Sequence, residues 1–187
     1  MRELSLHILD IAQNAIKANA ENLRIAIIED TAEDKLIIKI KDDGIGMDSG
    51  TVAKVVDPFY TTRTTRNVGL GIPMFKTAAE QCDGYFKINS QPGVGTEIVA
   101  QFKHSHIDRV PLGDMAQTII TIINACDQMD LVYTHCVDGR GFRLNTKEIR
   151  KLLEGVPLNN IDVIAWLHDY IKEGLNDIYT AAKQEAI

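Results

Sequence analysis

Two stretches, Asp10-Ile-Ala-Gln-Asn-Ala-Ile-Lys17 and Asp42-Asp-Gly-Ile-Gly-Met47, decide the fold of this chain. The first lies within residues 4–18, where apolar side chains recur at steps of three and four, the period of a helix that buries one face. The second follows an apolar run and holds carboxylates followed by two spaced glycines, which let the backbone pass close to a flat ligand. Taken alone, the first stretch can be interpreted as the solvated face of a helix and the second as a common turn.

The elements predicted around these stretches form an alpha/beta layer. Residues 22–29 and 35–41 alternate apolar and polar side chains on either side of a turn, which predicts an antiparallel hairpin. Residues 48–68 have no clear period and predict a long, mobile loop with one short helix. The elements expected after this loop are a helix over 71–82 and strands over 85–90 and 97–102.

The stretch 104–113 breaks all periodicity and is the predicted boundary between two units. We divide the chain into a first domain over 1–103, a linker over 104–112 and a small α/β domain over 113–187. The elements expected in this second domain are a helix near 114–126, strands over 131–137 and 141–144, and helices near 147–153 and 161–175.

Composition and charge exclude several classes of protein. Hydrophobic residues make up 45% of the chain and charged residues 25%, typical of a globular protein. The net charge is −6 and the basic residues are scattered along the sequence, so we expect neither nucleic acid nor a membrane surface as a partner. No apolar run is long enough for a signal peptide or a membrane span, which favours a cytoplasmic location. Three widely spaced cysteines argue against disulfides and zinc.

Further polar and glycine-rich features lie at the ends of predicted elements. Val68-Gly-Leu-Gly-Ile72 opens a helix, so its free amides and the helix dipole make a natural phosphate site. Gly93-Val-Gly-Thr96 begins a strand and by itself indicates only a tight hairpin. One face of the first helix carries a polar stripe made of His7, Asp10, Asn14 and Lys17. In chain order the polar stripe, the stretch 42–47 and the two glycine-rich stretches are four features, each lying where a nucleotide could be touched, and this order favours a nucleotide site.

In this order the motifs resemble the ATP-binding domain of the gyrase, chaperone, histidine-kinase and MutL (GHKL) superfamily, over roughly residues 4–102. The resemblance implies an α+β fold, a two-layer α/β sandwich of the GHKL (Bergerat) type, with ATP and Mg²⁺ as ligands. The matching motifs are 10–17 for the N box, 42–46 for the G1 box, Asp57-Pro-Phe-Tyr-Thr-Thr62 for the F box, Gly69-Leu-Gly71 for the G2 box and Gly95-Thr96 for the G3 box.

Carried over position by position, the resemblance assigns roles in nucleotide binding. Asn14 is implied to hold Mg²⁺, and Asp42 to accept a hydrogen bond from the adenine amino group, with Thr96 nearby. Gly44 and Gly46 are implied to allow close approach to the base, and 48–68 to form the ATP lid. Gly69 and Gly71 would donate amides to the phosphates, and Lys17, Arg63 or Arg66 would offset the phosphate charge. The remaining implied contacts are Met47, Thr62 and Leu70.

Position 10 bears on whether ATP is turned over. Hydrolysing members of the superfamily usually carry Glu there and typical histidine kinases carry Asn, whereas this chain carries Asp. An aspartate within reach of water can act as a general base, but its stem is one methylene shorter than that of Glu, so slow activity is expected. The plainer interpretation is that Asp10 only orients Asn14 or His7.

The function expected from this resemblance is a histidine-kinase-like regulatory protein kinase or ATPase that binds ATP or ADP and acts on an unidentified protein partner. The alternative is a non-catalytic, nucleotide-sensing interaction module. The chain begins close to the N box, so we expect a stand-alone type without a phosphoacceptor histidine domain. The strand that usually precedes the first helix is also missing, so the sheet edge is expected to be covered by the C-terminal unit or by a second subunit in a homodimer.

A third hypothesis is a metabolic enzyme whose site lies in the C-terminal unit and uses His135, Cys136 and Asp138. We give it low weight, because His135 and Cys136 are adjacent on a predicted strand and so point to opposite faces. That is poor geometry for a nucleophile and its base. The stretches 108–114 and 137–142 are interpreted either as recognition loops or as linker and turn.

Overall fold

The protein is built on one mixed, six-stranded sheet with the strand order β3-β4-β2-β1-β5-β6. A computed structural model describes residues 2–57 and 70–185. The strands are β1 (Asn22–Asp30), β2 (Lys35–Asp42), β3 (Tyr85–Gln91), β4 (Gly95–Lys103), β5 (Asp130–Val137) and β6 (Arg140–Asn145). The helices are α1 (Leu4–Lys17), α2 (Ser49–Val55), α3 (Gly71–Glu80), α4 (Met115–Ala125), α5 (Thr146–Leu152) and α6 (Ile161–Glu185).

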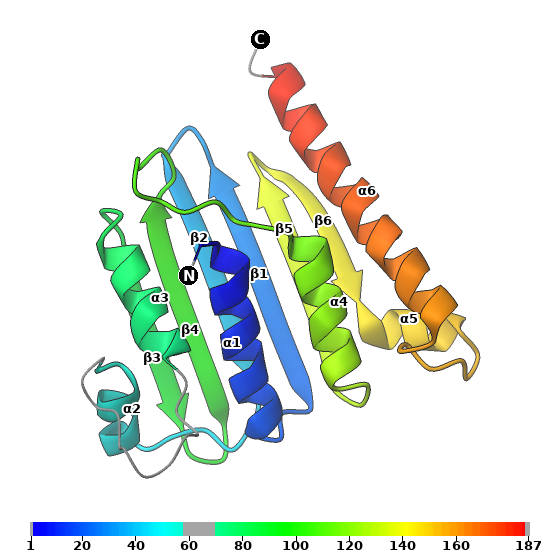
Figure 1. Ribbon diagram of the computed structural model, residues 1–187, viewed down its shortest axis with the longest axis horizontal. Helices are drawn as coiled ribbons and strands as arrows, with labels where there is room; N and C mark the ends of the chain where they lie inside the picture. The colour runs from blue at the N-terminus through cyan, green and yellow to red at the C-terminus, as the bar shows by residue number, and fades with distance from the viewer. Residues whose placement is uncertain (1, 58–69, 186–187) are drawn as a thin grey trace.

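Helices cover one face of this sheet, with α1, α3 and α4 lying over the strands and running roughly along them, and with α6 packing beside α4 (Figure 1). The strands alternate accordingly: Leu23, Ile25 and Ile27 of β1 are buried beneath the helices, and the residues between them are partly or fully exposed. The arrangement has two layers, and the predicted α+β class is confirmed.

The local predictions for the first hundred residues are confirmed where the structure describes them. The expected helix over 4–18 is α1, and the expected hairpin is the antiparallel pair β1–β2, with Ile25 opposite Ile40. The short helix expected within 48–68 is α2, whose first turn is capped by Asp48, since the carboxylate accepts the Thr51 amide at 2.8 Å. Residues 58–68 of that loop lie outside the described residues.

Residues after 113 extend the same sheet. β5 pairs with β1 in parallel, with Leu131 opposite Leu23, and β6 pairs with β5 in antiparallel orientation. The edge of β1 is therefore covered by the C-terminal unit of the same chain, one of the two expected solutions. The segment 104–112 also contacts α1, because the first amides of that helix, those of Leu4 and Ser5, donate to Pro111 and Leu112 at 3.0 and 2.8 Å. The division into two domains stays a prediction.

Within the ranges 2–57 and 70–185, no helix combines the length and the apolar character that crossing a bilayer requires.

Candidate functional site

A cavity of about 270 Å³ lies between the second half of α1, the adjoining ends of β2 and β4, α2 and the start of α3. We call it the Asp42 cavity. Isoleucines from four elements make much of its wall, and a flat apolar group would pack well between them. The predicted nucleotide contacts that the structure brings together on this wall are Asn14, Lys17, Asp42, Gly46, Met47 and Thr96.

Asp42 is the buried carboxylate of this cavity. It ends β2 opposite Thr96 and is 8% exposed. Burial raises the pKa of Asp42, and hydrogen bonds from the backbone amides of Gly44 and Thr96 oppose the shift. The Gly44 amide donates to Oδ1 at 2.9 Å. Two amides use only part of the roughly four acceptor positions of a carboxylate, so Asp42 retains capacity for a donor inside the cavity.

The glycines after Asp42 let the loop pack tightly against protein backbone. A Cβ on Gly44 would lie 2.8 Å from the carbonyl oxygen of Ala18, at the end of α1. Gly46 has a φ of +66°, and a Cβ there would lie 2.0 Å from the Gln91 carbonyl oxygen. The sequence predicted that these glycines allow close approach to a base. In the structure both glycines lie tightly against the backbone of the chain itself, and Gly46 also lines the Asp42 cavity.

Asp10 lies against Gly71, the first residue of α3. A Cβ on Gly71 would come within 2.7 Å of the Asp10 Cβ and 3.0 Å of its Oδ2 atom. Burial raises the pKa of Asp10, and the charge of Lys17 opposes this shift. A raised pKa makes a carboxylate a better general base, but Asp10 and Gly71 stand beside the wall of the Asp42 cavity rather than in it.

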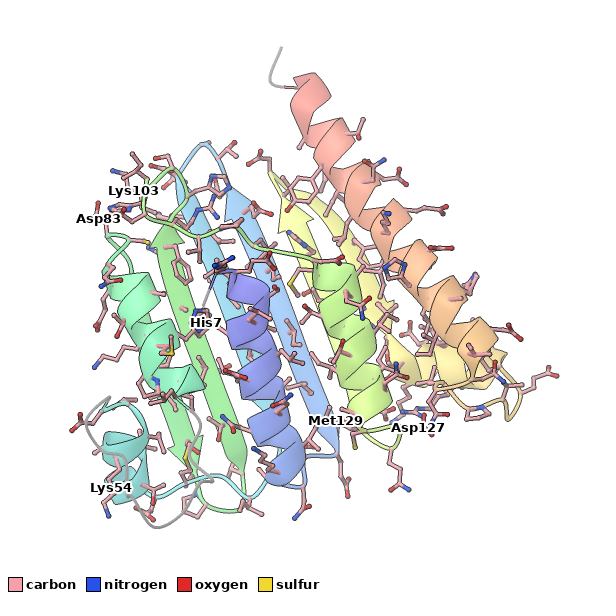
Figure 2. The ribbon with its side chains drawn as sticks, viewed as in Figure 1. His7, Lys54, Asp83, Lys103, Asp127 and Met129 are labelled. Carbon is pink, nitrogen blue, oxygen red and sulfur yellow. The ribbon has the colours of Figure 1, made fainter. Side chains whose placement is uncertain are left out.

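A second cavity, of about 250 Å³, lies along α3 and is lined by His7 of α1, among others. Figure 2 shows His7 projecting from α1 toward α3. Its ring stacks on Phe75 at 5.3 Å, it is 2% exposed, and burial lowers its pKa, as expected for a neutral, packed histidine. Leu70, a predicted nucleotide contact, is 52% exposed and lines this second cavity instead of the Asp42 cavity. Four further predicted contacts lie outside the described residues: Thr62, Arg63, Arg66 and Gly69.

The residues of the third hypothesis do not converge. His135 faces the helices and is 1% exposed, and Cys136 next to it on β5 points to the opposite face. Asp138 ties the β1–β2 turn, since it accepts the amide and hydroxyl of Thr31 at 2.8 and 2.9 Å. The three side chains thus lie on opposite faces of β5 and at the adjoining turn, and they do not form one site.

His135 instead belongs to a buried polar cluster that sequence reasoning missed. Its Nε2 lies 2.8 Å from Oε1 of Glu29, and its Nδ1 lies 2.9 Å from the Tyr133 hydroxyl. Glu29 also accepts hydrogen bonds from Tyr179 of α6 and from His104, whose Nε2 is 3.0 Å from Oε2. The only local signal was a histidine within the alternating apolar run of β5, which indicates a buried imidazole that needs partners.

Glu29 is ionised in this cluster. Burial by itself would raise its pKa, but hydrogen bonds from His135, Tyr179 and His104 outweigh it and lower the pKa to about 2. The cluster joins β1, β5, the segment 104–112 and α6, and none of its members lines either cavity. It is a structural connection between the two halves of the chain.

Comparison with known proteins identifies the first half of the chain. Residues 2–106 match the family described as histidine kinase-, DNA gyrase B- and HSP90-like ATPases. The chain is similar to the sensor protein kinase FleS of Pseudomonas aeruginosa, with 37% identity over 89 residues, which is 48% of this chain and 22% of that protein. It is also similar to the sensor histidine kinase YvrG of Bacillus subtilis, with 31% identity over 94 residues, 48% of this chain and 16% of that one.

Among solved structures, the ATPase domain of Aquifex aeolicus MutL complexed with ADP gives a TM-score of 0.49 at 12% identity, over 90% of this chain and 88% of that one. The chain spans less than a quarter of the length of the two kinases it matches.

Proposed function

This chain belongs to the family of histidine kinase-, DNA gyrase B- and HSP90-like ATPases, and on that premise we propose that it binds Mg-ATP in the Asp42 cavity and acts as a regulatory protein kinase or ATPase on a protein partner. The observation that carries the nucleotide proposal is Asp42 itself. A buried carboxylate with unused acceptor capacity at an apolar cavity is costly unless a ligand donates to it.

The adenine base meets these requirements. Its faces would pack between the isoleucines of the cavity, and its amino group would donate to Asp42. A site of this kind rejects an otherwise similar base that lacks the amino group, because the buried carboxylate is then left without its donor. Inosine triphosphate, which carries a carbonyl in place of that amino group, is therefore the discriminating analogue.

Asn14 is the residue that would hold Mg²⁺, through its side-chain oxygen. Within the described ranges, no group of three or more His, Cys, Asp or Glu side chains is arranged to hold a metal ion. This fits a cation bound largely by phosphate oxygens and water with few protein ligands, as is usual for Mg²⁺. When bound, Mg²⁺ would offset the negative charge of the phosphates, as Lys17 would beside it.

Asp10 would be the general base for an attacking water or hydroxyl, one helical turn before Asn14. Its raised pKa supports this role. The alternative, a nucleotide sensor without turnover, is favoured by one specific observation: Asp10 packs against Gly71 and does not line the cavity.

The test is calorimetric titration of Mg-ATP, Mg-ADP and Mg-ITP into the wild type, Asp42→Asn and Asp43→Asn. Asp43 is the matched control, because its carboxylate bonds Asn22 and the Glu21 amide rather than the cavity. We expect ATP to bind the wild type and the control, and both ITP and Asp42→Asn to weaken binding at least about tenfold. Equal binding of ATP and ITP would contradict the role of Asp42.

Phosphate release, with and without added partner proteins, then separates the two functions. Turnover that disappears in Asp10→Asn while ATP still binds supports the kinase or ATPase. Binding without any phosphate release or phosphoryl transfer supports the nucleotide sensor.

A further inference from the structure

The face of the sheet opposite the helices carries a concentration of positive charge. Two neighbouring rows of side chains cross all six strands on this face, and register places them side by side. The first row is Asn89, Glu97, Lys41, Arg24, Val132 and Asn145, and the second is Lys87, Val99, Lys39, Ala26, Thr134 and Arg143. Five of these residues are cations and one is a carboxylate, in a chain whose net charge is −6.

This arrangement is invisible along the sequence, where the five cations are far apart. All five are exposed, because the alternation of each strand turns them away from the helical layer. Two of them have partners: Lys41 is 3.9 Å from Glu97, and Arg143 forms a bidentate pair with Glu148 at 3.0 Å. We call the five, Arg24, Lys39, Lys41, Lys87 and Arg143, the basic face.

The other three cations, Arg24, Lys39 and Lys87, form no ion pair with any residue the structure describes. Arg24 lies directly opposite Lys41 in the β1–β2 pair. Like charges in that position repel each other and lower the stability of the sheet. A negatively charged partner on this face would remove that repulsion.

The row next to the basic face is uncharged and holds Ile28 and Ile37 side by side on β1 and β2, with Cys136 on β5. All three are half-buried. Small apolar side chains, Ala26, Val99 and Val132, also lie between the cations. The surface therefore offers charge and apolar contact together, as protein interfaces do.

We propose that the open sheet face is a docking surface for an acidic protein segment that carries aliphatic side chains beside its carboxylates. The carboxylates lie over the basic face and the aliphatic groups over Ile28 and Ile37. Single-stranded nucleic acid fits less well, because successive bases need a series of stacking platforms and the three rows hold one aromatic side chain, Tyr85 in the row of Ile28 and Ile37.

The proposal goes beyond nucleotide binding and does not depend on it. Asp42 and Thr96 face the helical layer, whereas Lys41 and Glu97 next to them face the opposite way. A partner on the basic face and a nucleotide in the Asp42 cavity thus occupy opposite sides of β2 and β4.

The test measures binding of a fluorescein-labelled, Glu-rich peptide with interspersed leucines, by anisotropy in the absence of nucleotide at about 0.15 M salt. The variant is Lys39→Gln with Lys87→Gln. The control is Lys151→Gln with Lys172→Gln, which removes the same charge from exposed positions on α5 and α6. We expect the first pair to weaken binding on the order of tenfold, and the control pair to leave it within about twofold.

Equal weakening by both pairs, or no binding by the wild type, would overturn the proposal. A labelled single-stranded oligonucleotide that binds through Lys39 and Lys87 while the peptide does not would assign the face to nucleic acid and overturn it as well. So would sedimentation showing self-association that the first pair abolishes, since the occupant would then be a second copy of the chain. Calorimetric titration of Mg-ATP into the same variants measures nucleotide binding independently. A failure of the docking proposal can therefore be distinguished from a failure of the nucleotide-binding proposal.

Discussion

Asp42 and Glu29 are two carboxylates of equal burial on the same face of one sheet, and their pKa values shift in opposite directions. Each is 8% exposed and points toward the helical layer. Burial raises the pKa of Asp42, and two backbone amides only partly oppose it. At the other end of the sheet, His135, Tyr179 and His104 donate to Glu29 and lower its pKa to about 2 despite burial.

The difference shows that burial of a charge does not by itself mark a binding site. Glu29 has three partners from three other parts of the chain, His104, His135 of β5 and Tyr179 of α6, and is satisfied by the fold. Asp42 faces a cavity, and its carboxylate has acceptor positions that no protein group in the described part of the chain fills. Its buried charge therefore lowers the stability of the folded protein. Glu29 therefore stabilises the structure, whereas the buried charge of Asp42 lowers its stability by an amount that a hydrogen bond from a ligand can offset.

The largest effect is expected for Glu29→Gln, which removes the charge that His135, His104 and Tyr179 surround. We expect the free energy of unfolding at neutral pH to fall by about 3 kcal/mol, because a buried network loses its central partner. Urea unfolding followed by circular dichroism measures it. Asp42→Asn is the matched control, and an equal loss in both variants would contradict the comparison.

The pH dependence of stability should show the same difference. The folded-state pKa of Glu29, about 2, lies below its ordinary value of 4.5, so its stabilisation is present above pH 4.5 and is lost as the pH falls toward 2. Over that window the wild type should lose about 3 kcal/mol relative to Glu29→Gln. Urea midpoints at a series of pH values test this, and parallel curves for the two proteins would refute it.

A smaller effect is expected for Gly71→Ala at the start of α3. The added Cβ would meet the Asp10 Cβ at 2.7 Å, so α1 and α3 must move apart, and the free energy of unfolding should fall by about 1 to 3 kcal/mol. Gly141→Ala is the control, since its Cβ would meet nothing closer than 4.0 Å. Equal melting temperatures for the two variants would show that the Asp10–Gly71 contact is not tight.

The smallest effect on stability is expected for Asp42→Asn. Because the folded-state pKa of Asp42 is raised, its charge lowers stability as the pH rises above its ordinary value, so the variant should equal or slightly exceed the wild type, by less than about 1 kcal/mol at neutral pH. The same variant should lose Mg-ATP affinity at least about tenfold. A marked loss of stability would mean that Asp42 holds the fold together as Glu29 does.

Local patterns predicted the first half of the fold well. The alternation of apolar and polar side chains in 22–29 and 35–41 predicted the β1–β2 hairpin, and the spacing of apolar side chains in 4–18 predicted α1. Both elements could be predicted because they depend on residues that are close together in the sequence. The motifs also placed Asp42 correctly at the end of a strand. That the six predicted contacts on the Asp42 cavity touch a nucleotide stays a prediction.

The pairing of β5 with β1 could not be predicted, and neither could what depends on it. Glu29 and His135 meet across 106 residues, and no local pattern shows that a buried acid in one strand will face an imidazole in another. For the same reason the sequence indicated scattered basic residues, whereas strand register gathers five of them into the basic face.

The sequence by itself therefore determined the places of the helices, the hairpin and the family of the first half, since periodicity and short motifs are local properties of the chain. The last helix is the exception in length, because α6 continues to Glu185 whereas its predicted end was at 175. Only the tertiary structure decided that the second half continues the same sheet, that Glu29 is satisfied while Asp42 is not, and that one face of the sheet is basic. These properties depend on strand order and register, which are set by packing between residues far apart in the chain.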